Sequence, residues 1–155
     1  MDAGSLAEAA RLTVGIVLVV SGVGKLVARR GSQVELGGFG VPATLVPAAA
    51  LAIPVAELVV ALLVLVVPAR WPVWLAVAAF ALFTGVVVAE LQRGVTAPCR
   101  CFGSLSTRPM STRALLRNTW FLALAVVATA ASGLGDVGWL ALPLLAVSAA
   151  LILTT

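Results

Sequence analysis

The stretch "RLTVGIVLVVSGVGKLVARR", residues 11–30, decides the fold class of this chain. A membrane-spanning helix needs about 20 mostly apolar residues to cross about 30 Å of hydrocarbon. The segment from Ala9 to Ala28 meets that requirement. A cleaved signal peptide carries its positive charge before the apolar stretch, whereas most of the charge here follows it. We therefore expect a retained membrane helix over Ala9–Ala28, with its amino end outside the cell.

Further apolar runs repeat this pattern along the chain. Hydrophobic residues make up 62% of the sequence and charged residues 10%, against roughly a half and a quarter in soluble domains. The segment 31–42, "GSQVELGGFGVP", carries the glycines and the proline of a loop or a bent interfacial segment. These patterns predict an all-α integral membrane protein with a single domain, residues 1–155: a compact four-helix transmembrane bundle plus a short fifth C-terminal transmembrane helix. The later helices are expected over Ala43–Val67, Val73–Leu91, Ser111 or Thr112 to about Ser132, and Gly138–Leu153.

The composition excludes several classes of site. The chain has no histidine, no tyrosine and only two cysteines. A haem held by histidine, a histidine-based zinc site and a Ser-His-Asp triad are thereby excluded. Two cysteines cannot complete a tetrahedral zinc site within one chain, so we expect no metal. The net charge of +4 comes from basic residues at the ends of apolar runs, which favours membrane lipid and not nucleic acid as a partner.

The basic residues are divided unequally between the two sides of the membrane. If the five expected helices alternate in direction, eight basic residues fall on one side and two on the other. Cytoplasmic loops carry the excess of lysine and arginine. We therefore expect the amino end outside and the cysteine-bearing loop on the cytoplasmic face of a bacterial-type inner (cell) membrane. The eight are Lys25, Arg29, Arg30, Arg93, Arg100, Arg108, Arg113 and Arg117, and the two are Arg11 and Arg70.

The two cysteines, Cys99 and Cys101, lie in the segment "APCRCFG", residues 97–103, on either side of Arg100. A disulfide across so small a ring has poor geometry and is readily reduced. The arginine favours the thiolate, which is the reactive form. The pattern indicates a redox exchange centre. The alternatives are a structural or metal-bridging role across a homo-oligomer, or no role beyond that of small apolar residues.

Charged residues inside the expected helices form a second candidate site. Glu57 lies midway along an apolar helix, where an ionised carboxylate costs on the order of 3 kcal/mol, so we expect it to face the bundle interior. Lys25, Glu90, Arg117 and Asn118 lie near helix ends at the depth of the cysteine loop. They are expected either to form an ion-pair cluster that joins the first, third and fourth helices, or to supply a proton donor or a quinone-binding group beside the thiols. A membrane quinone is the candidate cofactor.

Four motifs resemble the MauE/DoxX family of redox-associated integral membrane proteins, and its MauE branch in particular. They are "VSGVGKL" (20–26), "GGFGVP" (37–42) with "PVAEL" (54–58), "PCRCFG" (98–103) and "LLRN" (115–118). The resemblance implies a compact helical bundle in the membrane. MauE-type proteins are linked to maturation of the disulfide-rich small subunit of methylamine dehydrogenase, and DoxX-type proteins to thiol and sulfur redox complexes. Carried over, Cys99 and Cys101 are the redox pair, and the supporting polar residues are Lys25, Glu57, Arg117 and Asn118.

Three functions are therefore open. The first is thiol–disulfide exchange with a partner protein, which would make the chain an oxidoreductase with a quinone as electron acceptor. The second is a non-catalytic maturation or assembly factor. The third is a transporter of a small solute with Glu57 as the proton-coupled group. The family resemblance and the charge bias predict opposite sides of the membrane for the thiols. Maturation of an exported partner requires thiols that face outward, whereas the charge bias places them in the cytoplasm.

Overall fold

The computed structural model describes residues 3–94, 111–130 and 141–154, and within these ranges all regular structure is helical. Three of the helices are long and apolar enough to cross a membrane, which confirms the predicted class of all-α integral membrane protein. The other helices are shorter, 17 residues in α5 and 14 in the C-terminal α6. The helices are α1 (Ala3–Val27), α2 (Arg29–Gly38), α3 (Val46–Val66), α4 (Trp71–Gln92), α5 (Thr112–Ala128) and α6 (Ala141–Thr154).

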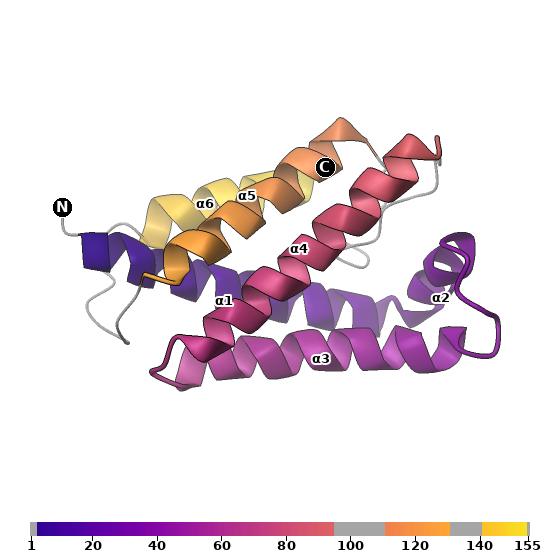
Figure 1. The fold of residues 1–155 in the computed structure, drawn as a ribbon, viewed down its shortest axis with the longest axis horizontal. Helices are drawn as coiled ribbons and strands as arrows, with labels where there is room; N and C mark the ends of the chain where they lie inside the picture. The colour runs from indigo at the N-terminus through magenta and orange to yellow at the C-terminus, as the bar shows by residue number, and fades with distance from the viewer. Residues whose placement is uncertain (1–2, 95–110, 131–140, 155) are drawn as a thin grey trace.

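Helix α1 is the centre of the bundle and contacts α3, α5 and α6 (Figure 1). Two of its glycines allow α3 to come close. A Cβ atom on Gly15 would lie 2.5 Å from Leu65 Cδ2, and one on Gly22 would lie 3.0 Å from the backbone oxygen of Pro54. Small residues at a membrane helix interface let the backbones approach and pack. The α1–α3 contact therefore depends on these glycines.

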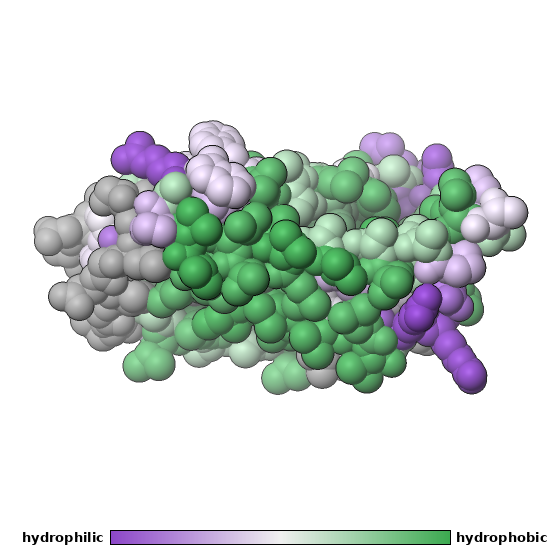
Figure 2. Space-filling view, turned by 90° about the horizontal axis from the view of Figure 1, so that it is seen from below, coloured by the Kyte–Doolittle hydropathy of each residue, from purple (hydrophilic) through white to green (hydrophobic). Residues whose placement is uncertain are grey.

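The outward faces of α3 and α4 are apolar, as contact with lipid requires. Figure 2 shows hydrophobic side chains across the middle of one face of the molecule and polar side chains toward its two ends. Trp71 and Trp74, at the start of α4, are 53% and 58% exposed. Tryptophan at helix ends suits the interface between hydrocarbon and headgroups.

Of the two interpretations of segment 31–42, a loop or a bent interfacial segment, the structure contradicts the loop. Most of the segment belongs to α2, which begins directly after Ala28 and ends at Gly38. Ser32 in this helix is buried, and Gly40, with a φ of +81°, lies in the turn that follows. Glycine adopts that left-handed conformation without strain, so the motif marks the end of a helix and not a continuous loop.

Several helix boundaries also differ from the prediction. Helix α1 begins at Ala3 and not at Ala9, and α3 begins at Val46 and not at Ala43. Pro47 therefore lies in the first turn of α3, where proline is tolerated because its missing N–H has no helical partner. Ser111 holds the N-cap position of α5 as predicted, with extended backbone but no capping hydrogen bond from its side chain.

The predicted fifth helix is present as α6. Trp120 of α5 donates a hydrogen bond of 3.4 Å to Ser148 of α6. The expected boundaries near Ser132 and Gly138 lie outside the described residues.

Candidate functional site

Lys25 and Glu57 form a buried ion pair between α1 and α3. Only 11% of the lysine side chain and 2% of the glutamate side chain are exposed. The Lys25 ammonium also donates a hydrogen bond of 2.9 Å to Ser21 Oγ and lies 4.7 Å from the centre of the Phe83 ring. The expectation that Glu57 faces the interior, against a polar group of another helix, agrees with this geometry.

Local sequence explains how the pair forms. Ser21 and Lys25 are four residues apart and therefore lie on one face of α1. Lys25 belongs to the last turn of α1, where the helix dipole favours a positive charge. Figure 1 shows α3 extending past the end of α1 toward α2, so Glu57 in the middle of α3 is level with the end of α1.

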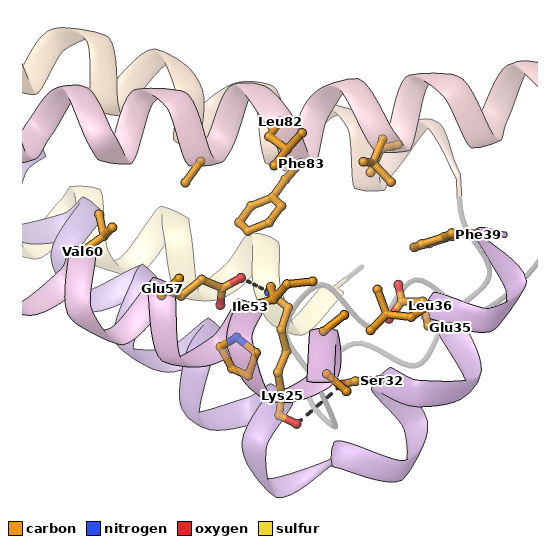
Figure 3. A pocket seen from close by; sticks show the side chains of 17 residues that line it. Lys25, Ser32, Glu35, Leu36, Phe39, Ile53, Glu57, Val60, Leu82 and Phe83 are labelled. Atoms are coloured by element: carbon orange, nitrogen blue, oxygen red, sulfur yellow. Dashed lines mark hydrogen bonds and ion pairs between the residues drawn. The ribbon is translucent and has the colours of Figure 1, made fainter. Parts of the chain in front are cut away.

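A cavity of about 320 Å³ lies beside this ion pair. Helices α1, α2, α3 and α4 all contribute to its wall, which is mostly apolar. Phe83 projects from α4 toward the pair in Figure 3, and Ser32 and Glu35 line the α2 side. The second oxygen of Glu57, Oε2, is buried and has no hydrogen-bond partner among the described residues. The apolar lining also includes Leu36, Phe39, Ile53, Val60, Leu82, Val86 and Val87.

The other predicted polar residues lie elsewhere in the bundle. Lys25 was expected to cluster with Glu90, Arg117 and Asn118, but it pairs with Glu57 instead. Glu90, near the end of α4, is 3% exposed and accepts a hydrogen bond of 2.9 Å from Arg93. Arg117 and Asn118 are buried in α5. Their functional roles stay predictions.

Cys99, Arg100 and Cys101 lie outside the described residues. The prediction of a redox pair therefore stands on the sequence. The described residues on either side of the segment, Gly94 after α4 and Ser111 before α5, belong to helix ends that lie toward the same end of the bundle as α2 (Figure 1). Among the described residues, no group of three or more His, Cys, Asp or Glu side chains could hold a metal ion.

Sequence reasoning missed the role of Arg11. It assigned this residue to the outer flank of the first helix, but the structure buries it to 1% exposure. Arg11 Nε donates a hydrogen bond of 2.8 Å to the Val64 carbonyl, and Nη2 donates to the Val67 carbonyl. Val64 lies in the last turn of α3, where backbone oxygens lack helical partners, and Val67 is the residue that directly follows the helix. The Val67 carbonyl also accepts a hydrogen bond of 2.8 Å from the Ala69 backbone N–H. The sequence did contain a signal for this role. Arg11 lies near the start of α1, and the antiparallel α3 ends at the same level, where its last carbonyls need donors.

The sequence matches the model of one protein family, described as methylamine utilisation protein MauE, over residues 3–131. This match covers most of the chain. The chain belongs to the MauE family. No curated protein and no solved structure matches it.

The MauE match contains both candidate sites. It runs from the start of α1 to just beyond α5, so it includes the Lys25–Glu57 pair and the two cysteines. Helix α6 lies after the matched residues. The resemblance of the sequence motifs to the MauE branch is therefore confirmed for the part of the chain that carries them.

Proposed function

We propose that this MauE-family protein is a membrane-embedded thiol–disulfide exchange protein that uses Cys99 and Cys101. The observation that carries the proposal is the spacing: two thiols separated by a single arginine, in a polar segment between two helices of an otherwise apolar chain. The spacing favours a labile disulfide, and Arg100 favours the thiolate. Strain destabilises the disulfide and the arginine stabilises the thiolate, so both effects favour the reduced form and make the pair a relatively strong oxidant.

The exchange proceeds through a mixed disulfide. A partner thiolate attacks one sulfur of the Cys99–Cys101 disulfide, and the other sulfur leaves as a thiolate. A second partner thiolate then resolves the mixed disulfide, which leaves the partner oxidised and the pair reduced. Restoring the disulfide removes two electrons and two protons, and a membrane quinone that becomes a hydroquinone accepts both.

The family description points to methylamine utilisation as the setting. The resemblance to MauE-type proteins makes the disulfide-rich small subunit of methylamine dehydrogenase the candidate partner if the thiols face outward. If they face the cytoplasm, as the charge bias predicts, the partner is a cytoplasmic protein. A non-catalytic maturation factor for that small subunit is the second candidate, and it makes no use of the thiols. The ion pair with Lys25 gives Glu57 a structural reason to be buried, and this weakens the argument for a transporter with Glu57 as the proton-coupled group.

Redox titration of the purified protein, with thiol alkylation and mass analysis, tests the proposal. We expect one disulfide to form and break reversibly at a potential above about −300 mV. Structural disulfides typically have potentials below this value. Arg100→Glu should lower the potential, and Arg100→Lys, which keeps the charge, should not. If the thiols never bridge, or bridge as stably as a structural disulfide, the exchange mechanism is wrong and the maturation-factor role takes its place.

A further inference from the structure

The cavity beside the Lys25–Glu57 pair supports an inference about a ligand. It lies where α3 and α4 diverge after their tight connecting turn (Figure 1). Leu82, which lines it from α4, is 65% exposed. Because the outer faces of these two helices are apolar, the cavity opens toward the hydrocarbon. A ligand that enters this way is lipophilic.

The polar groups of the wall determine what kind of ligand fits. An ammonium group has three N–H donors. In Lys25 they face Glu57 Oε1, Ser21 Oγ and the Phe83 ring. Glu57 Oε2, by contrast, has no hydrogen-bond partner within the described part of the chain. Of the other polar residues in the wall, Ser32 donates its hydroxyl to the Lys25 carbonyl, and the Glu35 carboxylate has no donor to give. Next to the ion pair the site therefore offers a ligand the acceptor Glu57 Oε2.

Charge and size narrow the ligand further. A cationic donor would add a second positive charge next to the Lys25 ammonium, which is unfavourable in a low dielectric. A neutral O–H group avoids this repulsion. The volume of about 320 Å³ falls at the lower end of small-molecule sites. Phe83 and Ile53 line the cavity and provide apolar surface against which a ring can pack.

We propose that this cavity binds a lipophilic hydroquinone, with one ring O–H group donating a hydrogen bond to Glu57. Oε2 is covered in the structure, so the carboxylate turns about its terminal torsion, which is broad and soft, to receive the donor. The quinone form lacks the O–H groups and is expected to bind less well. Under the proposed function the hydroquinone is the product of dithiol oxidation, but the site is built from residues that do not include the cysteines.

Binding is tested with the full chain in nanodiscs under reducing conditions. The probes are a short-tailed alkyl hydroquinone, its dimethyl ether and the corresponding quinone, measured by titration calorimetry. A hydrogen bond to a charged acceptor should make the hydroquinone bind about tenfold or more tightly than the ether and the quinone. The variant Cys99→Ser with Cys101→Ser should bind it equally well, so the result does not depend on whether the cysteines exchange disulfides.

Variants locate the site. Lys25→Met combined with Glu57→Leu removes the acceptor without leaving a buried charge, and should reduce the preference for the hydroquinone to less than about twofold. Ala79→Trp places an indole in the cavity and should block all three probes. Ala78→Trp, at an exposed position of the same helix, should not.

Three results would overturn the proposal. One is equal affinity for the hydroquinone and its dimethyl ether in the unmodified protein, since the cavity would then recognise only apolar bulk, as of a lipid acyl chain. The second is equal affinity for the quinone. The third is the absence of saturable binding, which would leave water as the partner of Glu57. The unmodified protein alone decides these outcomes, even if a variant fails to fold.

Discussion

Separating Lys25 from Glu57 should destabilise the protein strongly and asymmetrically. Removing one partner of a buried ion pair costs about 3–5 kcal/mol, because the other charge is left uncompensated. After Glu57→Gln the ammonium keeps Ser21 and the Phe83 ring, and the cation–π contact alone is worth about 0.5–2 kcal/mol. After Lys25→Met the carboxylate keeps no hydrogen-bond partner among the described side chains. We expect a loss near 3 kcal/mol for the first variant and near 5 kcal/mol for the second.

The double variant Lys25→Met with Glu57→Leu should recover most of this loss, because replacing a buried pair by apolar groups is often neutral. The measurement is reversible unfolding in mixed micelles, followed by tryptophan fluorescence, with free energies compared in a double-mutant cycle. Val55→Met, at a position that is 44% exposed two residues before Glu57, is the matched control. Losses below about 1 kcal/mol in both single variants, or a double variant equal to their sum, would refute the pairing.

Packing and charge lead to four other predictions. Gly22→Ala should cost about 1–3 kcal/mol in the same unfolding assay, because the new Cβ would lie 2.8 Å from Leu58 Cγ. Gly85→Ala, with nothing within 4 Å, should instead stabilise α4 by up to about 1 kcal/mol. Arg11→Met should cost about 1–3 kcal/mol, because the buried Val64 carbonyl loses its donor and the Val67 carbonyl keeps only the Ala69 N–H, and a neutral result would show that the Val64 carbonyl finds another partner. A membrane-impermeant maleimide should label the cysteine pair only after cells are opened, and labelling of intact cells would invert the predicted topology.

The sequence predicts some of these features well because they depend on local properties. Hydropathy over about 20 residues is enough to find a membrane helix, and α1, α3 and α4 lie where it indicates. The inward position of Glu57 follows from the cost of exposing a carboxylate to lipid. The end of α2 was obscured because glycines that close a helix also occur in loops.

The partner of Lys25 could not be predicted in the same way. If all helices began and ended at the same depth in the membrane, Lys25 would lie beside other residues at helix ends, such as Glu90. The pair with Glu57 depends on how far α3 is displaced along α1, and this displacement follows from α2. Because α2 extends the chain as a helix before it turns back, α3 begins beyond the end of α1 (Figure 1). The sequence interpretation of this segment, as a loop or a bent interfacial segment, did not specify such a displacement.

The contacts of α1 explain why the cavity lies between α3 and α4. Helix α1 holds α3 at two levels. Arg11 donates hydrogen bonds to carbonyls near the C-terminal end of α3, and Lys25 forms its ion pair with Glu57 near the middle of α3. Between them, Gly15 and Gly22 bring the two helices into close contact. Helix α4 packs mainly on α5 and meets α3 most closely at their connecting turn. The divergence of α3 and α4 therefore follows from packing that does not involve a ligand. The cavity, with Glu57 in its wall, is formed before anything binds. A ligand that enters a preformed site spends least of its binding energy on ordering that site.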